Sequence, residues 1–192
     1  MDAIAQDVLD FWFGAPGLPE RGRKRDVWFR KDAAFDDAIR ARFGTAVATA
    51  IAGDFADWDA NAEGTLAHVL LLDQFTRNVF RDTPRAFAGD AQALAVADAA
   101  IARGFDRALD PFGRWFLYLP FEHAEDADMQ RRSLALFGEL ARETGDPIPL
   151  EWAQKHADVI FRFGRYPHRN AILGRASTPE EAAFLALPDS RF

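Results

Sequence analysis

The sequence contains no cysteine, which excludes disulfide bonds and thiolate chemistry. It also lacks any apolar run near the roughly 20 residues that a membrane-spanning helix requires. The first residues, Met1 to Ile4, include no basic group of the kind that begins a signal peptide. Together these absences predict a cytoplasmic protein that does not cross a membrane.

Positive charge is scarce relative to negative charge. The chain has 23 lysines and arginines against 30 aspartates and glutamates, a formal net charge of -7. Neutralising nucleic-acid phosphates and docking on anionic lipids both need a basic surface. We therefore expect neither nucleic acid nor a membrane among the partners of this protein.

The familiar motifs of catalysis and metal binding are also missing. There is no P-loop, dinucleotide fingerprint or HExxH motif, and no signature of a Ser-His-Asp triad. The Glu-x-x-His pattern of helical di-metal sites does not occur either. Serine is scarce, and Ser177 suits the entry to a final helix better than a nucleophile. The sequence therefore predicts no metal site and no cofactor.

Aromatic residues, by contrast, are plentiful. The 192 residues include 18 Phe and 5 Trp, and 49% of the chain is hydrophobic, so we expect one domain over residues 1–192 with an aromatic-rich core. The apolar residues recur with helical spacing, and no stretch alternates convincingly like a strand. An all-α protein follows from this pattern.

Helix-capping residues, glycines and prolines indicate where the expected helices begin and end. We expect helices over residues 3–13, 33–52, 63–80, 90–103, 112–119, from 121 or 125 to 142, and 151–163. Asp2 and Asp32 are the expected N-caps of the first two, Gly164 the expected C-terminal stop of the last, and Pro120 the expected kink or break. The run Thr178-Pro179-Glu180-Glu181 predicts a capping box that opens one more helix. Short connections favour antiparallel helix hairpins.

Three polar-rich stretches stand among these helices, at residues 72–81, 119–126 and 163–170. Each mixes charged groups with aromatic groups more tightly than a solvated surface needs. Burying such groups costs free energy unless they are paired or serve a function. A function, if these stretches carry one, would lie there.

In the first stretch, a helical wheel places Asp73 and Arg77 within an apolar sector, four residues apart, so that they can pair along the helix. Gln74 and Asn78 lie beside them. Two interpretations remain open. The four residues form a structural network, or they are ligand-binding residues that open onto a pocket.

The second stretch is an acidic turn after Pro120. The wheel of the following helix puts Glu122 and Asp126 on the core-facing side and His123 at its edge. His123 with Asp126 would supply two metal ligands, whereas His123 with Glu122 would supply an acid–base pair. Helix capping and ion pairs to arginines are the structural alternative.

The third stretch continues a helix whose expected apolar stripe consists of Trp152, Val159, Ile160 and Phe163. His156 lies in the middle of this stripe, either as a core group or as an imidazole that titrates near neutral pH. Beyond it come the candidate ligand-binding residues Arg165, Arg169 and Asn170 and the candidate catalytic residue His168. These arginines either bind a carboxylate or phosphate, or neutralise the acidic groups Asp73, Glu122, Glu125 and Asp126 internally.

Taken together, these motifs resemble a bacterial family known as domain of unknown function 924. The matching runs are VLDFWFG at 8–14, LLDQF at 71–75 with Arg77 and Asn78, PFEH at 120–123 with Glu125 and Asp126, and RFGRYPHRN at 162–170 continued by 173–175 and 177–178. Ala124 and Tyr166 depart from the commoner Ser and Phe. The resemblance implies a tetratricopeptide-like α–α superhelix of antiparallel helix pairs, with about eight to ten helices. It implies no established activity.

Three hypotheses follow for the function. In the first, Arg77, Arg165 and Arg169 hold a small anionic ligand, and His123 or His168 exchanges a proton. In the second, the protein is a helical module that binds a protein or peptide. In the third, the polar stretches only hold the fold. The sequence does not decide whether the protein is an enzyme, and it does not predict an oligomeric state.

Overall fold

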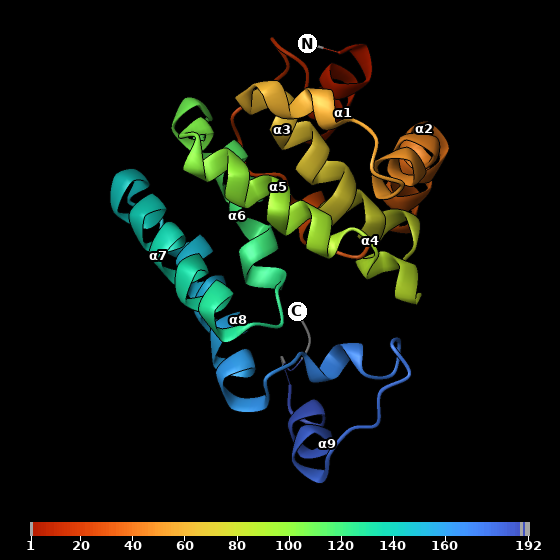
Figure 1. The fold of residues 1–192 in the computed structure, drawn as a ribbon, viewed down its shortest axis with the longest axis vertical. Coiled ribbons are helices and arrows are strands. Elements are labelled where there is room, and N and C mark those ends of the chain that lie inside the picture. Colours follow the sequence, from red (N-terminus) through yellow and green to blue (C-terminus); the bar gives the residue numbers. More distant parts are fainter. Residues whose placement is uncertain (1, 189, 191–192) are drawn as a thin grey trace. The chain divides into compact units, whose positions relative to one another are not determined.

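A computed structural model of the protein describes residues 2–188 and 190. Over these residues the chain is all-α, and they include no β-strand, which confirms the predicted fold class. The chain divides into two compact units (Figure 1). The first comprises Met1–Arg81 and Arg85–Pro120, and the second comprises Asp82–Pro84 and Phe121–Phe192. The expectation of one domain and that of a superhelix both stay predictions.

The first unit contains the helices up to α5. They are α1 (Ala3–Phe13), α2 (Ala33–Ile51), α3 (Ala62–Val69), α4 (Thr76–Val79) and α5 (Asp90–Ala102). A π-helical stretch, Leu70–Phe75, joins α3 to α4, so the helix predicted over 63–80 is continuous but locally widened. Helix α6 (Pro111–His123) crosses the division between the units at Pro120.

The second unit contains α7 (Ala127–Thr144), α8 (Ile148–Phe163) and α9 (Pro179–Leu185). Helices α7 and α8 pack along their length as the expected antiparallel hairpin. Between α8 and α9 lies a segment of bends and turns that includes a short 3-10 helix at Pro167–Arg169. This segment carries most of the third polar stretch.

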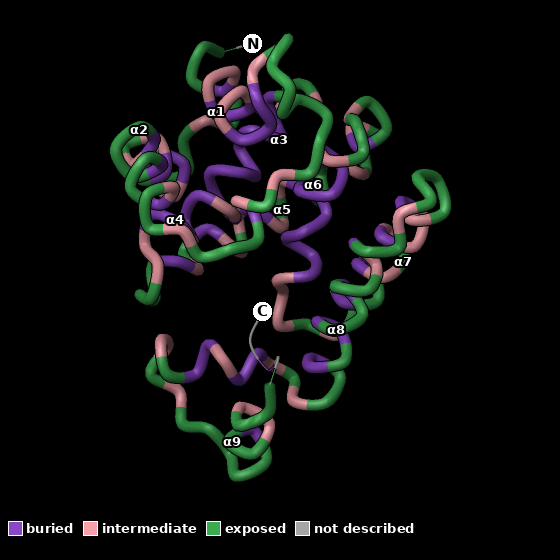
Figure 2. The backbone as a smooth tube through the Cα atoms, turned by 180° about the vertical axis from the view of Figure 1, so that it is seen from behind, coloured by how far each residue is buried: buried purple, intermediate pink, exposed green. Residues whose placement is uncertain are grey.

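Aromatic rings fill the core of the first unit, as the composition predicts. Trp12 packs against Phe75 and Phe116, with ring centroids 5.3 Å apart in both pairs. Phe43 contacts the same Phe75 ring at 5.1 Å. Helix α3 is almost continuously buried in this unit (Figure 2). The π-helical stretch that follows α3 is equally buried, and it carries the charged group of Asp73 inside the protein.

The predicted helix caps are confirmed. The side chains of Asp2 and Asp32 accept hydrogen bonds from the first-turn amides of α1 and α2. Gly164 ends α8 in the left-handed conformation, with φ of 69°. At α9, the Thr178 side chain accepts from the Glu181 amide, and the Glu181 carboxylate accepts from the Thr178 amide. Short-range sequence rules therefore place these helix ends correctly.

Two local expectations are wrong, and the two alternatives at Pro120 are narrowed to one. Pro120 does not break its helix, because α6 continues to His123. A kink at Pro120 stays a prediction. The break falls at residues 124–126, so α7 begins close to the later of the two predicted starts, 121 and 125. The helical wheel through this break therefore fails for Asp126, which is exposed and caps α7 through the amides of Asp128 and Met129. Trp152 does not belong to the buried stripe of α8, since it is 42% exposed.

Gln130 explains why the chain breaks after His123. Its side-chain Nε2 lies 2.8 Å from the carbonyl oxygens of both Glu122 and Ala124, and 3.2 Å from that of Phe121. The last carbonyl groups of a helix have no partner within the helix. A fully buried amide that binds them lets α6 end inside the protein.

None of the helices within residues 2–188 and 190 combines the length and the apolar character needed to cross a membrane. The cytoplasmic location stays a prediction.

Gly64 gives a direct test of the packing in the first unit. A Cβ atom at this position of α3 would lie 2.4 Å from the carbonyl oxygen of Trp58. Because backbone cannot easily give way, Gly64→Ala should lower the free energy of unfolding by about 1–3 kcal/mol. Gly44→Ala is the matched control, since a Cβ there meets nothing within 4 Å. That substitution should raise the stability of α2 by about 0.5–1 kcal/mol. Denaturant titration measures the unfolding free energy of both variants. Equal changes in the two variants would contradict the close approach of Gly64 to the Trp58 carbonyl.

Candidate functional site

The first polar stretch forms ion pairs and hydrogen bonds within the first unit. Asp73 is completely buried, and its Oδ1 lies 3.3 Å from Nη1 of Arg77, which confirms the predicted pair along the helix. Arg77 also donates to both carboxylate oxygens of Asp90, at 2.9 and 3.1 Å, and Gln74 donates to Asp73. The stretch thereby ties α4 to the start of α5.

Asn78 and Arg81 bind a different helix. Asn78 donates to Asp36 on α2 at 2.7 Å, and Arg81 donates to both oxygens of the same carboxylate. Burial alone would raise the pKa of Asp36, but the hydrogen bonds from Arg81 and Asn78 outweigh it and hold that pKa below its ordinary value. These contacts give a structural account of the first stretch, and a ligand role for its residues stays a prediction.

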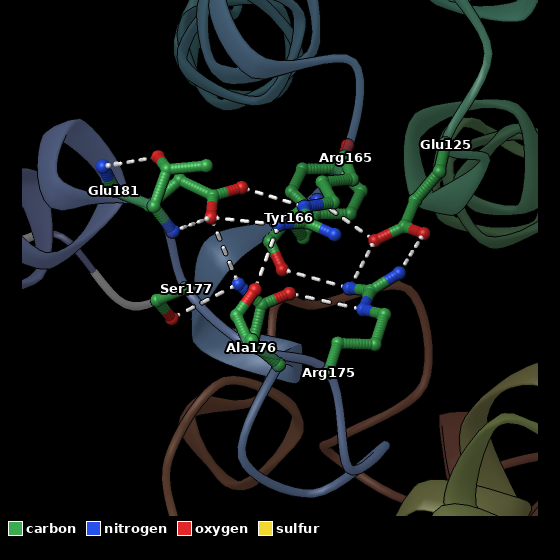
Figure 3. Close-up of polar contacts among 9 residues, drawn as sticks. Glu125, Arg165, Tyr166, Arg175, Ala176, Ser177 and Glu181 are labelled. Carbon is green, nitrogen blue, oxygen red and sulfur yellow. Dashed lines mark hydrogen bonds and ion pairs between the residues drawn. The ribbon is translucent and has the colours of Figure 1, made fainter.

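In the second unit, Glu125 joins the second polar stretch to the third. Its carboxylate accepts from Arg175 Nη1 at 2.6 Å and Nη2 at 2.9 Å, and from the backbone amide of Tyr166 at 2.7 Å (Figure 3). Burial opposes ionisation here, yet Arg175 and the Tyr166 amide together hold the pKa of Glu125 below its ordinary value. The carboxylate is thus an integral part of the turn after α8.

A second carboxylate, Glu181, organises the far end of the same segment. Arg165 donates to its two oxygens at 2.6 and 2.8 Å, and Asn170 lies 3.3 Å from one of them (Figure 3). The Arg165 guanidinium and the backbone amide of Thr178 lower the pKa of Glu181 to about 2. Asn170 also accepts from Arg175. The polar groups of Arg165 and Asn170 are therefore engaged with the protein itself.

Four aromatic rings of the second unit, one tyrosine and three histidines, lie next to this network. Tyr166 is completely buried, and its ring centroid lies 5.7 Å from that of His156 and 5.5 Å from that of His168. The His123 ring lies 6.3 Å from His156, and the Arg169 guanidinium stacks 4.5 Å above the Tyr166 ring. We call these five residues the histidine–tyrosine cluster.

His156 is the buried imidazole of the cluster. Its Nδ1 lies 2.9 Å from the carbonyl oxygen of Trp152, which can only accept, so Nδ1 carries a proton. Burial lowers the pKa of His156 to about 3, so the ring is neutral near pH 7. The same Nδ1 also lies 3.2 Å from the Glu122 carboxylate oxygen Oε1. His156 serves as a core group here, on the predicted buried face of α8.

Charged and titratable groups of both signs surround His156, since the Glu122 carboxylate contacts the same ring. His123, Arg169 and His168 each contribute to lowering its pKa by electrostatic repulsion. His123 and His168 are only partly buried, whereas Arg169 is 7% exposed. The Arg169 guanidinium and two partly accessible imidazoles thus lie close to His156 in a chain with a net charge of -7.

Tyr166 and Gln130 organise the cluster, and the sequence analysis assigned neither to the site. The Tyr166 hydroxyl donates to the Glu122 carbonyl and lies 3.1 Å from Gln130 Nε2. Burial raises the pKa of Tyr166 well above its ordinary range, so the hydroxyl remains protonated. In the sequence, Gln130 is a glutamine at the edge of an apolar helix face. That pattern is too common to indicate a site.

The sequence-predicted residues therefore fall into separate groups. Asp73, Gln74, Arg77 and Asn78 lie in the first unit, whereas Glu122, His123, His156, His168 and Arg169 come together in the second. Arg165 and Asn170 belong to the adjacent ion-pair network, and Asp126 is a helix cap. Within residues 2–188 and 190, no three His, Cys, Asp or Glu side chains are placed to hold a metal ion together.

Comparisons with known proteins agree with this all-helical fold and its motifs. The chain belongs to a family described as a bacterial protein of unknown function, DUF924, whose model matches residues 8–189. It is similar to a solved structure of a protein of unknown function from Agrobacterium tumefaciens. The two are 44% identical with a TM-score of 0.83, and the match covers 96% of this chain and 97% of the other. No functionally curated protein matches the chain.

The neutral state of His156 predicts a pH dependence of stability. Its pKa of about 3 in the folded protein lies below the value of about 6.5 for an unfolded chain. Between these values the unfolded state binds more protons, so stability rises with pH. We expect the unfolding free energy to increase from pH 5 to pH 7, by up to about 1.4 kcal/mol per pH unit at the acidic end.

Denaturant titrations of the wild type and His156→Gln across this range isolate the contribution of His156. The increase of the unfolding free energy with pH should be smaller in the variant, because glutamine does not titrate. Parallel curves for the two proteins would show that His156 ionises normally in the folded state. Glu125 and Glu181 interfere little, since their lowered pKa values place their titration below this window.

Proposed function

We propose that the histidine–tyrosine cluster binds a small anionic ligand, with His123 or His168 as its acid–base group. The observation that carries the proposal is the gathering of His156, His168 and the Arg169 guanidinium around the buried Tyr166 ring, with the His123 ring next to His156. An imidazole exchanges protons near neutral pH, and a guanidinium stays charged throughout that range. The ligand class that suits such a set is a phosphate or a carboxylate.

The neighbouring arginines stabilise the segment that carries the cluster. Arg162, Arg165 and Arg175 each bind a glutamate, namely Glu180, Glu181 and Glu125. Within the cluster, His123, Arg169 and His168 each lower the pKa of His156 by electrostatic repulsion. A bound anion would be attracted to the two partly exposed imidazoles and to the Arg169 guanidinium.

The proposal assigns distinct tasks to the cluster. Arg169 supplies permanent charge and is held in place by stacking on Tyr166. His123 and His168 supply charge or a proton as the pH requires. His156 and Gln130 position the rings and the end of α6 from inside the unit. The ion pairs of Glu125 with Arg175 and of Glu181 with Arg165 hold the segment that carries His168 and Arg169.

An interaction module is the second candidate function. Exposed apolar side chains on α8 favour it, since Ile148, Trp152 and Phe161 are 38%, 42% and 46% exposed. A helix that presents large apolar groups to solvent is typical of a protein–protein contact. Binding of a protein or peptide there would be insensitive to His123 and His168.

Titration with inorganic phosphate tests the proposal. Protonation of the imidazoles should strengthen binding, so isothermal titration calorimetry should give a lower Kd at pH 6 than at pH 8. His168→Ala and His123→Ala should each weaken binding by about tenfold, the loss of one charge-assisted hydrogen bond. A titration with chloride at the same ionic strength controls for the screening of charges by salt.

Arg131→Ala is the matched variant, because Arg131 is an exposed cation of α7 that pairs with Asp128 outside the cluster. It should leave phosphate binding unchanged. Equal losses in all three variants would mean that phosphate responds only to overall charge. Absence of binding by phosphate and by small dicarboxylates at pH 6 would overturn the anion site and favour the interaction module.

A further inference from the structure

The first unit contains a cavity that none of the polar stretches lines. Its volume is about 620 Å³, and it is lined by Asp2, Ala5, Thr49, Asp54, Phe55, Asp57, Trp58, Asn61 and Gly64. These residues come from the start of α1, the end of α2 and the turn before α3. A cavity of this size accommodates a small organic molecule.

An aromatic pair forms part of the cavity wall. The rings of Phe55 and Trp58 stack with centroids 4.1 Å apart and an angle of 20° between their planes. Phe55 has a φ of 72°, in the left-handed region that residues other than glycine seldom adopt. The close approach of Gly64 to the Trp58 carbonyl sets the turn against α3. The aromatic wall is therefore built by specific backbone geometry.

The polar part of the lining is acidic. Asp54 and Asp57 are exposed, and neither forms an ion pair or a side-chain hydrogen bond within residues 2–188 and 190. Asp2 is already engaged as the N-cap of α1, and Asn61 as that of α3. Lysine and arginine are absent from the residues that line the cavity. This differs from the polar stretches, where carboxylates are matched by arginines.

We propose that this cavity binds a small organic amine. Two carboxylates attract an ammonium group, while the neighbouring aromatic wall contacts its methylene chain and stabilises the cation through the ring quadrupoles. A bare divalent ion fits less well, because the structure places no set of three metal-ligating side chains in the part of the chain it describes. The ligand class is therefore an aliphatic di- or polyamine rather than a metal.

Calorimetric titration with spermidine tests this site in the full-length protein. The double variant Asp54→Asn/Asp57→Asn should weaken spermidine binding by about tenfold or more, because it removes two ion-pair partners. Phe55→Asn should weaken it by about threefold, the size of an exposed cation–π contact. Asparagine tolerates the left-handed backbone at position 55, so this variant should fold. Circular dichroism checks each variant before titration.

Glu20→Gln/Asp26→Asn is the matched control, since it removes the same charge from exposed residues of the first unit that do not line the cavity. The control variant should bind spermidine with the same Kd as the wild type. Magnesium at the same concentration of positive charge should not displace spermidine from the wild-type protein. Equal weakening in both double variants would overturn the proposal, because it would reveal attraction to net charge alone. Absence of spermidine binding to the wild type would overturn it as well.

Discussion

The ion pair between Glu125 and Arg175 is the interaction on which the second unit most depends. The segment between α8 and α9 has little regular structure, so its backbone groups need partners from elsewhere. Glu125 lies in the break between α6 and α7, and binds both the Arg175 guanidinium and the Tyr166 amide. Tyr166 in turn orients the rings of the histidine–tyrosine cluster. Without this carboxylate, a charged segment would lie against the core without compensation.

Much of the fold was predictable because it follows from short-range chemistry. Asp2 and Asp32 cap helices, Gly164 ends one in a left-handed conformation, and Thr178 with Glu181 forms a capping box. Each of these depends on residues no more than a few positions apart. Helical spacing of apolar residues similarly predicted an all-α chain with an aromatic core. The pair Asp73–Arg77 was predictable for the same reason, since one helical turn separates its members.

The errors arose where distant partners decide the local structure. Pro120 was expected to kink or break its helix, but the helix ends three residues later, where Gln130 from α7 binds its last carbonyl groups. That shift turned Asp126 from an expected core-facing group into an exposed cap. Sequence spacing does not indicate which arginine pairs with which carboxylate. Arg175 and Glu125, for example, are 50 residues apart. The sequence could therefore name charged residues near the site without showing which of them hold the fold.

A double-mutant cycle on Glu125 and Arg175 tests this account most directly. Glu125→Gln, Arg175→Met and their combination would be compared with the wild type by denaturant titration. A charge-assisted, bidentate and partly buried pair should give a coupling energy of about 1.5–3 kcal/mol. Each single variant should also alter the environment of the His168 imidazole in an NMR spectrum, because Tyr166 would lose its anchor. A coupling energy below about 0.5 kcal/mol, with unchanged histidine signals, would contradict the account.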